Sequence, residues 1–169
     1  DLPIARDLPA QVDVAIVGSG YTGLNAARVV AKSGATTAVF ERNHIGWGAS
    51  SRNGGMATPG IKQKAKVMFQ RYGKETGLEF WQASLDAIDL IDTLVKEEQI
   101  DCDWKRAGHV ALIVKPSHLE GLRESQAWMK QNLGHETQVL TADELPSDIG
   151  GSSYYGGLAD DTSGGLNPA

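Results

Sequence analysis

The sequence predicts an α/β protein in which a parallel strand–helix–strand unit comes first and a mixed α+β region follows. Three observations support this prediction. Residues 13–17 and 36–40 are short, apolar runs rich in β-branched side chains, which are typical of buried parallel strands. Residues 21–32, between them, carry apolar side chains at helical spacing. Beyond residue 100 the chain changes character, and short strand-like runs flank a helical stretch.

The first unit is bounded by residues with clear structural preferences. Its first strand runs directly into Gly18, and its helix stops just before Gly34, which suits the C′ position of a helix. The second strand is closed by Glu41. A strand, a helix and a strand within about thirty residues form a βαβ unit. Its crossover is expected to be right-handed.

The rest of the chain is predicted from its periodicity and its turn residues. A glycine- and serine-rich loop covers 46–55, and a helix with apolar residues at spacings of three and four covers 75–98. The sequences of 117–120 and 141–144 match capping boxes, which open helical turns. The other predicted elements are a short strand at 104–106, a strand at 108–114, a helix ending near 134, a strand at 137–140 and a short strand at 154–159.

The composition excludes several classes of protein. The 169 residues carry a formal net charge of −5, so no basic surface indicates nucleic acid or an anionic membrane as a partner. No apolar run approaches the roughly 18–20 residues that span a bilayer, and no signal peptide is expected at the start. Cys102 is the only cysteine, so an internal disulfide is excluded and a cytoplasmic location is expected.

No metal site is expected either. The four histidines lack the spacing of metal ligands. Asp86, Asp89 and Asp92 are spaced so that they could imitate a metal-binding cluster, but a solvated helix face is the preferred interpretation. His109 is interpreted as a half-buried strand residue and His44 as a polar loop residue.

The motif that carries chemistry is G-x-G-x-x-G between the first strand and the helix. Gly18 permits the tight turn out of the strand, Gly20 lets a pyrophosphate approach the backbone, and Gly23 lets the helix pack closely on the sheet. A phosphate would then lie at the helix N-terminus, where free N–H groups converge. Tyr21 and Thr22 are expected to donate backbone N–H groups there. The motif therefore predicts a Rossmann-like dinucleotide-binding unit.

A carboxylate completes this fingerprint. Glu41 stands about 20 residues after the motif, at the end of the second strand, where an acid accepts hydrogen bonds from ribose hydroxyls. NAD and FAD share the fingerprint, so the motif does not choose between them. The glycine-rich loop at 46–55 replaces the next helix of an NAD-binding half and suits a flavin beyond the pyrophosphate; a mobile surface loop is the alternative reading.

These residues resemble the D-amino-acid oxidase-like (DAO) family of FAD-dependent oxidoreductases, and most of all its gamma-glutamylputrescine oxidase type. The resemblance rests on 13–24, 40–42 and 46–55 and extends more weakly through 108–114 to 156–168. It covers nearly all of this chain but only the N-terminal part of the family's pattern. It implies a glutathione-reductase-like FAD/NAD(P)-binding fold that is incomplete here, with an FAD-binding region at 1–100 and the beginning of a substrate-binding α+β region at 101–169.

The resemblance also implies the residues that bind FAD. The glycine turn would hold the pyrophosphate, Glu41 and Arg42 the adenosine end, and the second loop the ribityl chain and flavin ring. Ser51 stands where the family usually has glycine. Some relatives attach flavin covalently through a histidine preceded by tryptophan; here Gly48 follows Trp47, so non-covalent FAD is expected. The implied cofactor-binding residues are Gly18, Gly20, Tyr21, Thr22, Gly23, Glu41, Arg42, Gly48, Ala49, Ser50, Arg52, Asn53, Gly54, Gly55 and Met56.

The family reaction is hydride transfer from the carbon beside an amine nitrogen to flavin N5, with a small amine or amino acid as substrate. No catalytic residue is assigned, because Arg52 is equally well explained as an anchor of its loop. The chain stops where a further helix is expected, so the active site is expected to be completed by a missing C-terminal portion or a companion polypeptide. The alternatives are an NAD-dependent dehydrogenase domain and a non-catalytic nucleotide-binding assembly subunit.

Overall fold

The computed structural model describes residues 8–149 and 153–168. They form two compact units, one running up to Gly54 and including Pro168, and the other comprising Gly55–Asn167. Each unit is described by itself. The boundary predicted near residue 100 falls inside the second unit and stays a prediction about the organisation of the FAD-binding and substrate-binding regions.

The first unit is the predicted βαβ unit. Strand β1 (Val14–Val17) pairs in parallel with β2 (Thr37–Phe40), from Val14 opposite Thr37 to Val17 opposite Phe40, and α1 (Tyr21–Lys32) connects them. The parallel pairing and the mixed α/β architecture confirm this part of the predicted fold. After α1 the chain turns at Gly34, whose φ of 91° lies in the left-handed region that favours glycine.

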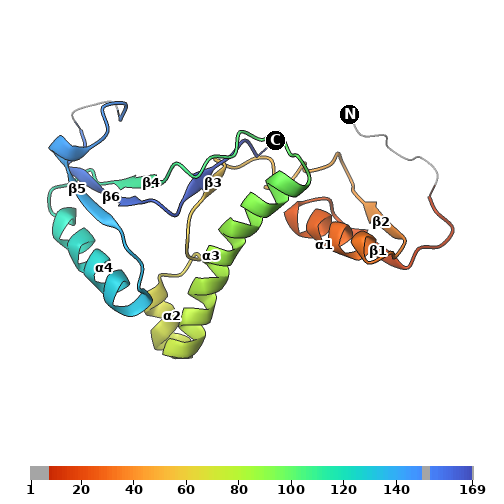
Figure 1. Ribbon diagram of the computed structural model, residues 1–169, viewed down its shortest axis with the longest axis horizontal. Helices are drawn as coiled ribbons and strands as arrows, with labels where there is room; N and C mark the ends of the chain where they lie inside the picture. Colours follow the sequence, from red (N-terminus) through yellow and green to blue (C-terminus); the bar gives the residue numbers. More distant parts are fainter. Residues whose placement is uncertain (1–7, 150–152, 169) are drawn as a thin grey trace. The chain divides into compact units, whose positions relative to one another are not determined.

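The second unit contains a short ribbon and a three-stranded antiparallel sheet (Figure 1). Strand β3 (Met56–Ala57) pairs with β7 (Gly164–Gly165). In the larger sheet, β6 (Gly156–Asp160) lies between β4 (His109–Leu112) and β5 (Gln138–Thr141). Helix α4 (His118–Leu133) runs along β5 and β6. The short 3₁₀ helix η1 (Ala142–Glu144) follows β5.

Two helices form a hairpin in the same unit. Helix α2 (Ala65–Tyr72) and helix α3 (Lys74–Glu97) meet at Gly73, and α2 packs against the beginning of α3. A Cβ at Gly77 would overlap the ring of Phe69, so the close approach of the two helices requires glycine there. The same ring meets Trp128 of α4 edge to face, with the ring centroids 5.3 Å apart, which links the hairpin to the helix beside the sheet.

Most predicted elements match, and the differences have local causes. The short strand predicted at 104–106 is wrong, since only Lys105 pairs there, in an isolated bridge to Gly165. Helix α2 and the two-residue strands β3 and β7 were not predicted, because each is too short to show a periodic pattern. The capping box predicted at 117–120 is wrong: Ser117 already has helical backbone angles and makes no side-chain cap. The box at 141–144 is confirmed, since the backbone N–H and hydroxyl of Thr141 both donate to Glu144 Oε2 at 2.8 Å.

The acidic face of α3 has protein partners. Asp89 Oδ1 and Asp92 Oδ2 lie 2.6 and 3.0 Å from the guanidinium of Arg106, and Trp104 Nε1 donates to Asp92 Oδ1 at 2.6 Å. Within residues 8–149 and 153–168, no group of three or more acidic, histidine or cysteine side chains is arranged to hold a metal ion. No helix in this described part is long and apolar enough to cross a membrane.

Candidate dinucleotide-binding site

The glycine turn has the geometry that its sequence predicts. Gly18 follows β1 with a φ of 97°, and its N–H donates to the Phe40 carbonyl at 2.8 Å, which extends the pairing of the two strands. A Cβ at Gly23 would overlap the carbonyl oxygen of Gly18, so α1 can start this close to the turn only with glycine at that position. The turn thus brings the start of α1 to the ends of both strands.

The N-terminus of α1 is suited to an anion. Its N-cap residue is Gly20, which has no side chain to cap the helix, and no acidic residue lies in the first turn. The Tyr21 N–H instead donates to Ser50 Oγ at 3.0 Å. A Cβ at Gly20 would also come within 3.0 Å of that hydroxyl. The second loop therefore meets the helix N-terminus at Ser50, where exposed N–H groups and the helix dipole favour negative charge.

The carboxylate of Glu41 is held at the glycine turn by Ser19, a residue that the sequence motif does not single out. Ser19 donates to Glu41 Oε2 from its backbone N–H at 3.0 Å and from its hydroxyl at 2.8 Å, and Asn43 N–H donates to Oε1 at 2.9 Å. The hydrogen bonds from Asn43 and from Ser19 lower the pKa of Glu41 to about 2. The carboxylate is therefore ionised at neutral pH and fixed in one orientation.

Ser19 also connects Glu41 to the second loop. It is 1% exposed, and its carbonyl and hydroxyl oxygens both accept from Gly46 N–H, at 3.3 and 3.2 Å. The only signal in the sequence was a small polar residue at a variable position of the motif. Nothing there indicated that this side chain would face the acid 22 residues away.

The second loop is tied mainly to itself. Arg52 Nε donates to the Gly48 carbonyl at 3.3 Å, and its guanidinium carbon lies 4.5 Å from the centroid of the Trp47 ring. The Asn53 amide donates to the carbonyls of Ala49 and Ser50 at 2.9 and 3.0 Å. These contacts match the reading of Arg52 as an anchor of its loop.

The loop also contains the serine that departs from the family pattern. Ser51 Oγ donates to the Gly46 carbonyl at 2.7 Å. His44 meets Trp47 edge to face, with the ring centroids 4.6 Å apart. Ser51 thus bonds within the loop and His44 contacts a residue of the loop, and neither of these contacts involves α1.

The structure divides the predicted site residues between the two units. The first unit holds those up to Gly54. Within it Gly18, Gly20, Gly23, Glu41 and Ser50 gather, half-buried, around the start of α1 together with the exposed Tyr21. The other predicted residues of this unit are exposed, namely Thr22, Arg42, Gly48, Ala49, Arg52, Asn53 and Gly54. Gly55 and Met56 belong to the second unit. There the Gly55 carbonyl accepts from Leu166 N–H at 2.9 Å, and Met56 is 67% exposed on β3.

This geometry is accompanied by similarity to known proteins. The family model for FAD dependent oxidoreductases, DAO, matches residues 13–169, and the chain belongs to that family. FAD is the cofactor of the family, which answers the choice between FAD and NAD that the motif left open.

The named relatives are longer proteins. "Probable oxidoreductase OrdL" of Haemophilus influenzae is 33% identical over 157 residues, which are 92% of this chain and 36% of that protein. Gamma-glutamylputrescine oxidoreductase of Escherichia coli is 30% identical over 156 residues, again 92% of this chain and 36% of the relative. The chain thus spans about a third of the length of these two relatives.

Solved structures share the fold. Glycine oxidase from Geobacillus kaustophilus aligns with a TM-score of 0.72 at 24% identity, over 93% of this chain and 41% of that one. L-amino acid deaminase from Proteus vulgaris, with a specific insertion sequence deleted, gives a TM-score of 0.72 at 19% identity, over 98% and 41%. At these identities the likeness establishes the fold.

Proposed function

We propose that this chain is the N-terminal, FAD-binding part of an enzyme that oxidises an amine or an amino acid at a carbon–nitrogen bond. Membership of the FAD dependent oxidoreductase family supports the redox chemistry. The relative named for gamma-glutamylputrescine and the fold neighbours named for glycine and L-amino acids support the substrate class. The single observation that carries the proposal is the meeting of the glycine turn, Glu41 and Ser50 at the uncapped start of α1.

The residues of the first unit fit the adenosine-pyrophosphate half of FAD. Gly23 keeps the turn compact at the start of α1, where a phosphate would accept from the N–H groups of Tyr21 and Thr22, beside the Ser50 hydroxyl that accepts from Tyr21 N–H. Glu41, ionised and oriented by Ser19, would accept hydrogen bonds from the ribose hydroxyls. Arg42 would lie beside the adenosine.

The second loop would continue along the cofactor. Its proposed contacts to the ribityl chain and the flavin ring are Gly48, Ala49, Ser50, Arg52, Asn53, Gly54, Gly55 and Met56. The bonds between Arg52, Asn53 and the loop carbonyls would keep this backbone in place while the ring binds. FAD would be bound non-covalently, since Gly48 stands where covalent relatives have histidine.

The bound flavin supplies the hydride acceptor for the carbon beside the amine nitrogen. The residues of this chain would bind and orient the cofactor, and we assign none of them a catalytic role. We propose that the active site is completed by polypeptide outside this chain and that 101–169 begin the substrate-binding region. The share of the relatives that the chain spans supports this arrangement. A cytoplasmic location accords with the single cysteine.

Anaerobic titration of the protein, purified together with the polypeptide that is proposed to complete it, tests the proposal. We expect a yellow protein whose flavin absorption bleaches on addition of gamma-glutamylputrescine, glycine or an L-amino acid, and acid precipitation should leave the flavin in the supernatant. Glu41→Gln should weaken FAD binding at least tenfold, whereas Glu120→Gln, on the exposed side of α4, should leave it unchanged.

Other outcomes would overturn the proposal. A flavoprotein that no amine or amino acid bleaches would favour the non-catalytic nucleotide-binding subunit. A colourless protein that binds NAD would contradict the cofactor assignment. A gel or intact-mass measurement showing one folded 18.0 kDa species that bleaches with substrate by itself would contradict completion by further polypeptide.

A further inference from the structure

The hairpin of α2 and α3 carries a local excess of positive charge. Acidic residues outnumber basic ones 21 to 16 in the whole chain, yet none occurs from Gly55 to Lys74. Five exposed basic side chains lie in this stretch, namely Lys62, Lys64, Lys66, Arg71 and Lys74. Within the described part of the chain, none of the five side chains forms an ion pair or a hydrogen bond. The net charge of −5 therefore conceals a basic surface on this hairpin.

Three large apolar side chains on the same hairpin are exposed as well. Ile61 precedes α2, Tyr72 ends it and Phe80 is on α3, and they are 46%, 52% and 43% exposed. Phe80 connects the other two. Ile61 and Phe80 line the same small cavity, and the ring centroids of Tyr72 and Phe80 are 6.2 Å apart. The three side chains thus form a continuous strip, which we call the apolar row.

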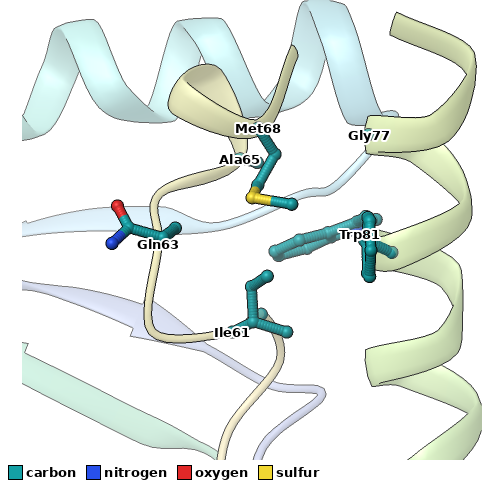
Figure 2. A pocket seen from close by; sticks show the side chains of 8 residues that line it. Ile61, Gln63, Ala65, Met68, Gly77 and Trp81 are labelled. Carbon is teal, nitrogen blue, oxygen red and sulfur yellow. The ribbon is translucent and has the colours of Figure 1, made fainter. Parts of the chain in front are cut away.

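The apolar row is held in place by the packing beneath it. In Figure 2, Ile61 and Met68 face Trp81 of α3 across the small cavity. This cavity measures about 10 Å³, which is room for about one water molecule, so the side chains around it pack closely. The Gly60 N–H also donates to Ser84 Oγ of α3 at 2.8 Å. The segment before α2 is therefore attached to α3, and its lysines are held beside the apolar row.

This arrangement matches the surface of an anionic membrane. Three of the lysines flank Ile61 and the start of α2, while Arg71 and Lys74 flank Tyr72, so cations lie at both ends of the apolar row. Clustered basic side chains are attracted to acidic lipid headgroups, and exposed apolar side chains beside them enter the interfacial region. A tyrosine ring is suited to this region because one end is apolar and the other is polar.

The type of cation favours a membrane over an acidic protein. Four of the five basic side chains are lysines, and lysine is depleted in protein–protein interfaces, where arginine is enriched. A lysine is a compact charge on a flexible stem and needs no fixed partner geometry, which suits a diffuse layer of headgroups. The acidic residues that follow on α3, Glu75 and Glu79, are outnumbered by the five cations.

From these observations we propose that the apolar row and the five cations bind the enzyme peripherally to membranes that contain anionic lipid. The apolar row would enter the headgroup region, and the cations would lie among the lipid phosphates. This contact goes beyond the proposed function and does not depend on turnover.

Cosedimentation with lipid vesicles tests the proposal on the FAD-loaded enzyme, purified with any polypeptide that accompanies this chain. We expect binding to vesicles made of equal parts of phosphatidylcholine and phosphatidylglycerol, and at least tenfold weaker binding to vesicles of phosphatidylcholine alone. Raising the salt concentration from about 0.1 M to about 1 M should release most of the bound enzyme, because the Debye length falls from about 10 Å to about 3 Å.

A charge variant and a matched control test which lysines matter. The charge variant carries Lys62→Gln, Lys64→Gln and Lys66→Gln. The control loses three exposed lysines elsewhere in the second unit, through Lys96→Gln, Lys105→Gln and Lys115→Gln. Each basic residue near an anionic bilayer strengthens binding about fivefold, so the charge variant should bind about a hundredfold more weakly and with a flatter salt dependence. The control should bind nearly as the parent does, and both should melt at the parent's temperature.

A further variant tests the apolar row. Tyr72→Ser removes an exposed ring without changing the charge, so it should weaken binding to the anionic vesicles about tenfold and leave the salt dependence as it is. A Tyr72→Ser enzyme that binds these vesicles like the parent would show that the row does not enter the membrane and would overturn that part of the proposal.

Other results would overturn the proposal as a whole. They are equal binding to the two kinds of vesicle, and equal binding by the charge variant and its control. Binding to polyglutamate without binding to the anionic vesicles would show that the basic surface recognises an acidic protein instead. Cosedimentation needs no substrate, so an enzyme that binds anionic vesicles but bleaches with no amine would contradict the proposed function and leave this contact supported.

Discussion

Replacing Gly23 with alanine tests whether close packing at the start of α1 is what this motif requires. A Cβ at Gly23 would overlap the Gly18 carbonyl oxygen and lie 3.4 Å from Ile16 Cγ2. Backbone atoms cannot rotate away, so α1 must shift along the turn. Gly121 provides the matched control, because it also lies in the first turns of a helix and a Cβ there would meet nothing within 4 Å.

The two substitutions have opposite expected signs. Alanine is favoured over glycine inside a helix by about 0.8–1 kcal/mol, so Gly121→Ala should raise the free energy of unfolding by about that amount. At Gly23 the same gain is opposed by about 1–3 kcal/mol or more of overpacking. Gly23→Ala should therefore be about 1–3 kcal/mol less stable than Gly121→Ala.

Urea unfolding and FAD titration measure these effects. Because the shift of α1 also moves the N–H groups of Tyr21 and Thr22, Gly23→Ala should bind FAD at least tenfold more weakly, whereas Gly121→Ala should bind it normally. A Gly23→Ala protein that is as stable as Gly121→Ala and retains FAD affinity would refute the reasoning.

The remaining predictions concern two hydrogen-bonded acids. Ser19→Ala removes one of the bonds that depress the pKa of Glu41, so this pKa should rise toward its ordinary value of 4.5, as ¹³C NMR of the carboxyl would show. A carboxyl group with a depressed pKa stabilises the folded state at pH values above its ordinary pKa, and this stabilisation is lost as the pH falls toward about 2. The variant has less of this stabilisation, so it should begin acid unfolding at a higher pH than the parent. Identical acid transitions would contradict this. Burial opposes ionisation of Asp160, but hydrogen bonds from Thr162 and His135 outweigh it and lower its pKa. His135→Phe should therefore cost about 1–3 kcal/mol of unfolding free energy in urea at neutral pH, because it leaves a half-buried carboxylate short of a donor; unchanged stability would contradict the role of this pair.

The elements with strong local signals were predictable from the sequence, and the others were not. Strands β1 and β2 follow from short runs rich in β-branched residues, helices α1 and α3 from apolar periodicity, and the end of α4 from Gly134. The strands of the ribbon, β3 and β7, pair across more than a hundred residues and have two residues each, so their existence depends on tertiary contact. Ser117 has the residue type of a cap, but the preceding turn is already helical and takes its place.

The candidate site shows the same division. The motif glycines and Glu41 were identified because each has a backbone or charge requirement at a set spacing. Ser19 was missed, and so was the pair of His135 with the half-buried Asp160 in the second unit, because a side-chain hydrogen bond between distant residues has no periodic signal.

The exposed apolar face of the first unit bears on how the enzyme is completed. Val17 is 91% exposed, and no residue of α1 is fully buried within the described chain. Parallel strands are ordinarily buried on both faces, because the helices of their crossovers cover them. Within the first unit taken by itself, two strands with one helix leave one face of the sheet and both of its edges to be covered. If the active site is completed by further polypeptide, as proposed above, we expect that polypeptide also to complete this sheet, so that FAD binding and the stability of the first unit depend on it together.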